Sequence, residues 1–498
     1  MTADGDAPVY LENKTFAEIA VGDTAQLTRT LGRNDIQLFA VMSGDVNPAH
    51  LDEDYAKSDM FHGIVAHGMW GGALISTVLG TLLPGPGTIY LAQTLRFTRP
   101  VALGDVITVT VKVVDKAEKS HRVVFDCACA NQRGEAVISG QAEVIAPTEK
   151  VRRLRSPLPQ VRLYDPGARY RELIAMSAGV APVRTAVAHP VDADSLRGAV
   201  EAGREGLIVP ILVGPAARIR SAAQGTGLDL DGIEMVDAAH SHEAAAKAVA
   251  LCRSGSAEAL MKGALHTDEL MHEVVAPQTG LATGRRMSHV FVMDVPAFPR
   301  RLFITDAAVN IYPDLEDKRD IVQNAIELAQ ALGVPTPRVA LLSAVETVTP
   351  KIRSTLECAA LCKMADRAQI LGGLLDGPLA FDSAVSDEAA RIKGIGSLVA
   401  GKADILVVPD LEAGNMLAKQ LSYLAQAQAA GIVLGARVPI VLTSRADGAV
   451  ARKASCAIAL LIMRHRQSPQ TMTRSLRIME APGTGAGPLR AAEVSGPG

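Results

Sequence analysis

Aromatic residues are scarce in this sequence. They make up 3% of its 498 residues, with a single Trp, so the chain has little material for the stacking platforms that bind single-stranded nucleic acid. Neither sign of charge dominates, because 50 basic residues stand against 53 acidic ones, and the basic residues are scattered rather than clustered. The sequence therefore predicts neither nucleic acid nor an anionic membrane surface as a partner.

Long apolar runs and a secretory leader are also missing. Gly, Pro or a charge interrupts each apolar stretch well short of the roughly 20 residues that span a membrane, and the chain starts acidic and polar rather than basic and then apolar. Six cysteines in so long a chain do not make a disulfide framework, and the close pairs lack further ligands at metal-binding spacing. We expect a soluble, cytoplasmic protein with reduced, buried thiols and no metal.

The composition and hydrophobic pattern divide the chain into three regions and a tail. More than one domain is expected, because the chain is longer than a single hydrophobic core usually accommodates. Residues 10–147 are predicted to form a first domain and residues 169–465 a second. Residues 148–168 are basic and carry three prolines, which is typical of a linker. Residues 466–498 have the composition of a flexible tail.

The first domain combines one helix with several long strands. Residues 67–83 are apolar with small residues at close spacing and predict a buried helix. The runs that follow alternate apolar with polar residues and are rich in Val, Ile and Thr, as half-buried antiparallel strands are. One buried helix wrapped by a meander of strands is the α+β hot-dog arrangement. The four runs are 89–101, 105–117, 121–132 and 136–147.

The second domain alternates short apolar runs with helix-like segments. This alternation predicts an α/β domain with a mostly parallel sheet covered by helices. The helix-like segments include 317–332, 379–395 and 415–430. The apolar runs lie at 206–215, 258–264, 289–295, 301–309, 337–345, 403–410 and 439–447.

A carboxylate and an imidazole stand close together just before the predicted buried helix. Asp45, Asn47, Pro48 and His50 lie within six residues. A carboxylate and an imidazole that share one water can make both proton transfers needed to hydrate a double bond conjugated to a thioester. The enolate oxygen formed on the way needs a backbone N–H at a helix start, and Gly68 suits that place.

Structural roles for the same residues are the alternative. Asp45 could begin a turn before Pro48, and His50 could neighbour the N-cap of the next helix. His62 and His67 are interpreted as structural rather than catalytic. A Ser in a buried helix, such as Ser76, can hydrogen-bond back to a carbonyl.

These motifs resemble the (R)-specific enoyl-CoA hydratases of the MaoC-like hot-dog group. The resemblance covers nearly all of residues 12–147 and rests on residues 44–50 (Gly-Asp-Val-Asn-Pro-Ala-His), on His67-Gly68-Met69 and on residues 83–109. It implies Asp45 and His50 as the acid/base pair, the Gly68 amide as the oxyanion donor and Ser76 as a supporting hydrogen bond. The reaction implied is hydration of a trans-2-enoyl-CoA to an (R)-3-hydroxyacyl-CoA.

The second domain lacks the glycine-rich nucleotide motifs, since no GxGxxG or GxxxxGK[ST] occurs in it. Polar clusters instead follow its apolar runs, and in open α/β sheets such clusters can converge on one cleft. Ser444 and Arg445 follow one such run. An Arg fork with a neighbouring hydroxyl suits phosphate.

This region resembles the phosphate acetyl/butyryltransferases, and the butyryl branch more closely, over about residues 175–460. The resemblance implies Ser444 and Arg445 as the phosphate site. The acetyl branch has an Asp six residues after the Arg, but position 451 is Ala; Asp447 could serve instead, or could cap the next helix. The matching motifs also contain Lys262 and His289, predicted as phosphate or CoA contacts, and Asn310 and Asn415, which contact substrate or hold turns.

Together the two resemblances predict a bifunctional enzyme of acyl-CoA metabolism. Its substrates would be acyl-CoA, CoA and inorganic phosphate, with no metal, flavin or nicotinamide. Both families imply a homo-oligomer. The alternative is that the second domain senses acyl-CoA without turnover, which the missing Asp at position 451 favours.

Overall fold

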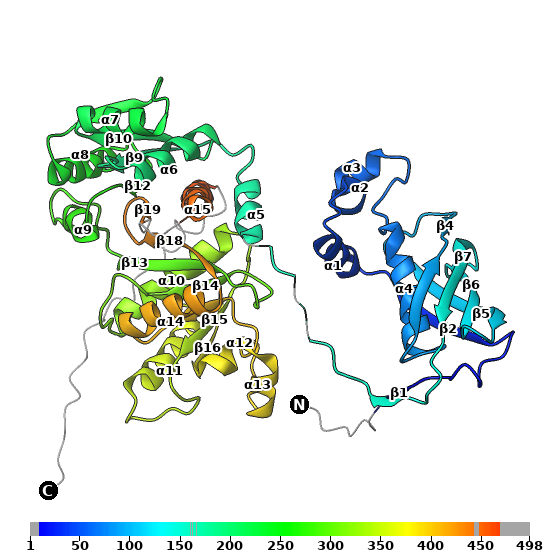
Figure 1. The fold of residues 1–498 in the computed structure, drawn as a ribbon. Helices are drawn as coiled ribbons and strands as arrows, with labels where there is room; N and C mark the ends of the chain where they lie inside the picture. Colours follow the sequence, from blue (N-terminus) through cyan, green and yellow to red (C-terminus); the bar gives the residue numbers. More distant parts are fainter. Residues whose placement is uncertain (1–8, 160, 162, 166, 443–447, 469–498) are drawn as a thin grey trace, which may run out of the picture. The chain divides into compact units, whose positions relative to one another are not determined.

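The computed structural model describes residues 9–159, 161, 163–165, 167–442 and 448–468 (Figure 1). The chain divides into two compact units, with the boundary between Tyr164 and Asp165. Each unit has its own hydrophobic core and is described by itself. Among the described helices, none combines the length and the apolar character that crossing a membrane requires.

An antiparallel sheet forms most of the N-terminal unit. Its strands follow the order β2-β5-β6-β7-β3, and β4 also pairs with β7. Burial alternates along β5 and β6, so one face of the sheet supplies Val and Ile side chains to the core, as the alternating sequence predicts. The strands are β2 (Thr24–Thr30), β3 (Ile89–Gln93), β4 (Arg96–Phe97), β5 (Val106–Ala117), β6 (Arg122–Ala130) and β7 (Ala136–Ile145).

Helix α4 (Gly68–Thr81) packs on this sheet and confirms the predicted hot-dog fold. Its buried side is formed by Trp70, Leu74, Ile75, Val78 and Leu79. The opposite side is exposed, which differs from the fully buried helix that we predicted. The difference arises because the residues on that side are small and uncharged (Gly, Ala, Ser and Thr), so the sequence shows no charged face that would mark it as exposed.

Three short helices precede α4 and carry the segment that contains Asp45. They are α1 (Arg33–Ser43), α2 (Pro48–Leu51) and α3 (Glu53–Ser58).

A short strand pair closes the N-terminal unit. β1 (Tyr10–Glu12) pairs antiparallel with β8 (Arg152–Leu154), so a strand forms inside the segment that we predicted to be linker. Asn13, 2% exposed, fastens this closure: its Nδ2 donates to the carbonyl oxygens of Pro86 (3.1 Å) and Glu149 (2.9 Å), and its Oδ1 accepts from the Val151 N–H (2.9 Å). One buried amide thus joins three separate segments.

We predict that Asn13→Ala destabilises the N-terminal unit by about 2 kcal/mol or more, because it leaves buried backbone groups without partners. Urea unfolding followed by circular dichroism measures the change. Glu118→Ala, at an exposed position, is the control and should stay within about 0.5 kcal/mol of the wild type. Equal stabilities of the two variants would show that Asn13 does not hold the closure.

The C-terminal unit contains an eleven-stranded sheet of order β11-β10-β9-β12-β19-β18-β13-β14-β17-β15-β16. Only β13 with β14, β13 with β18, and β18 with β19 pair antiparallel, so among the described pairings the sheet is mostly parallel, as predicted. The strands are β9 (Val183–Ala188), β10 (Ile208–Gly214), β11 (Glu234–Asp237), β12 (Ala259–Lys262), β13 (Ser288–Asp294), β14 (Leu302–Thr305), β15 (Arg338–Leu342), β16 (Leu374–Leu379), β17 (Ile405–Val407), β18 (Gln428–Leu434) and β19 (Ile440–Val441).

Helices cover both faces of this sheet (Figure 1). Along β9, Val187 packs into the core on one face, whereas Ala186 and Ala188 pack into the core on the other, as expected of a strand buried on both sides. The helices are α5 (Ala168–Met176), α6 (Ala193–Arg204), α7 (Ala216–Thr226), α8 (Ser241–Ser254), α9 (Thr267–Val275), α10 (Leu315–Ala331), α11 (Arg353–Asp366), α12 (Phe381–Val385), α13 (Asp387–Ile392), α14 (Leu411–Leu424) and α15 (Ala449–Gln467).

Two of the predicted helical segments differ from the structure. Residues 379–395 form two short helices, because Ser386 interrupts the first and caps the second. The helix predicted over 415–430 ends at Leu424, and β18 begins at Gln428. Pairing of β18 with both β13 and β19 outweighs the helical propensity of its alanines.

Candidate functional site

The loop that carries Asp45 is shaped by its own residues. Gly44, in the left-handed conformation at φ 76°, ends α1. An Asp45 carboxylate oxygen (Oδ1) accepts from the Asn47 N–H at 3.2 Å, and the Asn47 side chain caps α2 with Pro48 as its first residue. The turn that we considered as an alternative role of Asp45 is therefore present. The same turn leaves the second carboxylate oxygen available.

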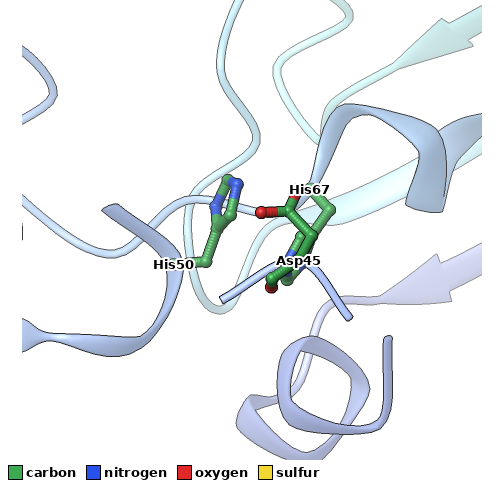
Figure 2. A group of neighbouring side chains, drawn as sticks. All are labelled: Asp45, His50 and His67. Atoms are coloured by element: carbon green, nitrogen blue, oxygen red, sulfur yellow. The ribbon is translucent and has the colours of Figure 1, made fainter. Parts of the chain in front are cut away.

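Asp45, His50 and His67 come together although they lie in different parts of the chain (Figure 2). Asp45 is in the loop between α1 and α2, His50 is in α2, and His67 is the N-cap residue of α4. Each offers a carboxylate oxygen or ring nitrogen, and these atoms all lie within 4.8 Å of one another. Asp45 is exposed, His50 is half-buried and His67 is buried. Figure 2 shows the Asp45 carboxylate directed toward the imidazole of His50.

The contacts of His50 define which of its nitrogens can act on a ligand. Its Nδ1 lies 2.9 Å from the carbonyl oxygen of Val65. A carbonyl only accepts hydrogen bonds, so Nδ1 carries the hydrogen. In the neutral ring, Nε2 then has the free lone pair that a proton acceptor needs.

Gly68 is the first residue of α4, immediately after its N-cap His67. Its N–H belongs to the first turn, which has no intrahelical acceptor, and no described residue accepts from it. The space here is tight, because a Cβ on Gly68 would lie 3.1 Å from the Phe97 ring and that ring would have to shift to admit it. A cavity of about 440 Å³ adjoins this amide and is lined by His50, Met60, Phe61, Trp70, Phe97 and Ile138 among others.

Two of the residues considered in this unit lie away from the group. Ser76 is on the exposed side of α4 and makes no side-chain hydrogen bond within the described part of the chain. His62 is exposed, in a turn with φ 57°. The structure therefore brings Asp45, His50 and Gly68 to one place and leaves Ser76 apart from them.

Asp45, His50 and His67 are residue types that can also bind a metal ion. Asp45, His50 and His67 could each supply one ligand atom. Both imidazoles already place one nitrogen on a backbone carbonyl, since Nε2 of His67 lies 3.0 Å from the Asp45 oxygen. One nitrogen of each ring remains for a ligand.

In the C-terminal unit, Lys262 and His189 lie at the ends of neighbouring strands. Lys262 ends β12, next to Ala188 of β9, and its Nζ donates to the Leu265 carbonyl oxygen at 3.0 Å. His189 follows β9 with φ 56° and is 5% exposed. Burial first, and Arg218 second, lower the pKa of His189. Sequence analysis missed His189, although a His-Pro pair directly after an apolar run marks the end of a strand.

His289 lies near the start of β13, and its ring lies over Gly431 of the neighbouring strand β18, toward the residue that follows β19. A Cβ on Gly431 would be 2.6 Å from Nε2 of His289 and 3.4 Å from the Leu442 carbonyl oxygen, so both approach the same glycine. The imidazole packs edge-on against Phe291, with ring centroids 4.3 Å apart. Burial lowers the pKa of His289 to about 4, and Asp306 opposes this, so the ring is neutral at pH 7.

Asn310 and Asn415 both make hydrogen bonds that hold loops. Asn310 Nδ2 donates to the Met287 carbonyl oxygen (2.8 Å), and its Oδ1 accepts from Arg286 Nε (2.6 Å). Asn415 Nδ2 donates to the Ala307 carbonyl oxygen at 3.3 Å. These contacts match the turn-holding alternative considered for both residues.

Ser444, Arg445 and Asp447 lie outside the described residues. In the sequence they stand between β19, which ends at Val441, and α15, which begins at Ala449. β12 and β14 run in opposite directions in the sheet. Lys262, the last residue of β12, and Asn310, which follows β14, therefore lie toward opposite edges of the sheet.

Comparison with known proteins agrees with the division of the chain into two units. The family model "Phosphate acetyl/butaryl transferase" matches residues 239–460. A phosphate acetyltransferase of Rhizobium meliloti is 66% identical over 303 residues, covering 61% of this chain and 96% of the relative. The chain belongs to the phosphate acetyl/butaryl transferase family. The model "MaoC like domain" matches residues 17–128, so a MaoC-like hot-dog domain precedes the transferase-family unit, as predicted.

Two solved structures extend the comparison. A branched-chain phosphotransacylase from Enterococcus faecalis V583 shares 30% identity and a TM-score of 0.50, covering 57% of this chain and 99% of that one. The R-hydratase PhaJ1 from Pseudomonas aeruginosa shares 46% identity, with a TM-score of 0.31, over 31% of this chain and 99% of that one.

We predict that the same substitution has opposite effects at two glycines of the transferase-family unit. Gly431→Ala should destabilise it by about 1–3 kcal/mol, because the new methyl group displaces the His289 imidazole. Gly225→Ala, in α7 with no atom within 4 Å of the added Cβ, should stabilise it by about 0.5–1 kcal/mol. Urea unfolding measures both. A Gly431→Ala variant as stable as the wild type would contradict the close approach of His289.

Proposed function

We propose that this protein is a bifunctional acyl-CoA enzyme. Its MaoC-like unit hydrates a trans-2-enoyl-CoA to an (R)-3-hydroxyacyl-CoA. Its transferase-family unit interconverts an acyl-CoA plus phosphate with an acyl phosphate plus CoA. The observation that carries the first activity is the grouping of Asp45 with His50, whose Nε2 is free and which lines one cavity together with Gly68. The second rests on likeness to the phosphate acetyltransferase over nearly its whole length.

The hydration assigns one task to each of these groups. A water between the Asp45 carboxylate and His50 Nε2 loses a proton to this pair as its oxygen bonds to C3 of the enoyl group. The pair delivers a proton to C2, so that H and OH add across the double bond. The thioester oxygen, negatively charged during the step, accepts a hydrogen bond from Gly68 at the positive end of α4. The apolar cavity walls suit an acyl chain.

We predict that Asp45→Asn lowers the kcat for crotonyl-CoA hydration by at least about 100-fold, within the range that a general acid or base contributes. The absorbance of the conjugated thioester measures the rate, and circular dichroism checks the fold. The exposed Asp54→Asn, in α3, is the matched control and should hydrate at the wild-type rate. EDTA should leave the wild-type rate unchanged, since no metal takes part in this step. Full activity of Asp45→Asn would overturn the assignment.

The transfer reaction places phosphate and the thioester carbonyl side by side. A phosphate oxygen forms a bond to the acyl carbon, the carbon–sulfur bond breaks, and the CoA thiolate takes up a proton. The tetrahedral intermediate carries negative charge that nearby donors must stabilise. Arg445 and Ser444 are the proposed phosphate donors, Lys262 and His289 the proposed contacts to phosphate or CoA, and Asp447 the proposed proton carrier.

A regulatory domain that binds acyl-CoA without turnover is the second candidate for this unit. One observation favours it, because position 451 holds a buried Ala where the acetyl branch has Asp. Incubating the protein with acetyl-CoA or butyryl-CoA and phosphate separates the two. We expect free thiol to appear at least about tenfold faster than with Ser444→Ala, whose phosphate site lacks one charge-assisted donor. Equal rates for the two proteins would support the sensor.

The proposal also covers partners and assembly. Acyl-CoA, CoA and inorganic phosphate are the proposed ligands, and neither reaction requires a flavin or a nicotinamide. A homo-oligomer in the cytoplasm is proposed, and sedimentation of the full chain tests the assembly.

A further inference from the structure

His67 contacts both members of the proposed acid–base pair, Asp45 and His50, and lines the cavity beside His50 and Gly68. It is 3% exposed. Its Nε2 lies 3.0 Å from the backbone oxygen of Asp45, which is 22 residues away. Its ring lies against that of His50, with centroids 3.9 Å apart. It is also the N-cap residue of α4, directly before Gly68.

The hydrogen-bond chemistry defines the role of the ring. Because the Asp45 carbonyl oxygen only accepts, Nε2 of His67 carries the hydrogen and donates it. Nδ1 is buried and has no partner among the described residues. A buried nitrogen without a hydrogen-bond partner destabilises the fold. If His67 served packing alone, an apolar side chain of similar size would therefore do at least as well.

The stacking contact extends this role to His50. Phe39 lies on His67 with ring centroids 5.0 Å apart and an interplanar angle of 34°, and His67 lies on His50 at 36°. The three rings form a stack in which His67 is the middle member. The Val65 carbonyl fixes the edge of the His50 ring, and the His67 ring limits its tilt.

We propose that His67 is the positioning residue of the hydration site. It holds Asp45 by the Nε2–H bond and His50 by stacking, so that the carboxylate and the free Nε2 of His50 face one water. This role rests on the proposed hydration and adds a third residue to it. His67 itself exchanges no proton with the substrate, because its donor is committed to the Asp45 carbonyl and its other nitrogen is buried.

Three substitutions separate positioning from packing and from capping. In His67→Gln the side-chain nitrogen stands the same number of bonds from Cα as Nε2 and can still donate to Asp45. In His67→Asn the nitrogen stands one bond nearer and cannot reach, although Asn is a strong N-cap residue. His67→Leu keeps apolar volume and has no donor. The matched control is His62→Asn, which removes an exposed imidazole from the same loop at a left-handed position that Asn tolerates.

The assay is crotonyl-CoA hydration by the full-length protein, with kcat and KM determined separately. We expect His67→Asn and His67→Leu to lower kcat by about 10- to 100-fold. In metalloenzymes, removing a residue that orients a functional histidine causes a loss of this size. KM should change less than kcat, since Gly68 and the apolar cavity walls that hold the substrate remain. His67→Gln should recover most of the loss, and His62→Asn should match the wild type. Unchanged kcat in His67→Leu, or equal losses in the Gln and Leu variants, would overturn the proposal.

A readout without substrate separates this proposal from the hydration itself. With ¹⁵N-labelled histidine, the two ring nitrogens report which one carries hydrogen. His67→Gln and a second variant, His50→Gln, each remove one signal and so identify it among the 11 histidines. We expect the Nε2–H form for His67 and the Nδ1–H form for His50. Other forms would overturn the positioning role even in an active enzyme. Wild-type protein that shows these forms but hydrates no enoyl-CoA would overturn the hydration and leave the hydrogen-bond geometry standing.

Discussion

Helix α4 packs closely on the sheet of the MaoC-like unit at Gly71. A Cβ on Gly71 would stand 2.2 Å from Cδ1 of Ile138 in β7, so the end of that side chain would have to move to admit it. This close approach lets the buried side of the helix interlock with the core. It holds the start of the helix in place against the sheet, and with it the Gly68 amide and the N-cap His67. The proposed site depends on that position, because Asp45 and His50 are aligned by contacts to the residues just before α4.

A glycine also permits a close approach in the transferase-family unit, where it makes room for a histidine ring. Gly431 in β18 leaves room for the His289 ring to lie across the neighbouring strand, at the point where β19 ends. Around it, buried polar groups are paired with backbone: Asp306 accepts from the N–H groups of Ala308 and Val309. Because hydrogen bonds to the backbone hold this loop, it does not depend on large side chains for its packing. The strand ends can therefore approach one another closely.

The sequence predicted most of the local features and few of the long-range ones. Asp45 and His50 were found because a carboxylate and an imidazole stand within six residues, and the Gly68 helix start was marked by its small residues. The bond from His67 to Asp45 spans 22 residues, and no periodic pattern carries such information. The exposure of Ser76 was equally hidden, because a helix with small residues all around does not show which side lacks a partner.

Strand assignment shows the same limit in the second unit. β10, β12, β13, β14, β15 and β17 were predicted from compact apolar runs, since burial on both faces leaves that signature. β18 was missed because its start is rich in Ala and Gln, and only its two neighbours make it a strand. β1 and β8 are three residues each, too short for any alternation, and their pairing is backed by the buried amide of Asn13, which links distant segments.

Backbone carbonyls, rather than carboxylates, hold the two imidazoles of the proposed hydration site. A carbonyl requires only one N–H, so it fixes the ring and its tautomer while the other nitrogen keeps its lone pair in the neutral ring. Val65 provides this for His50, and Asp45 itself provides it for His67. Asp45 thus has two separable parts, a backbone oxygen that is held in place and a carboxylate that remains free to act.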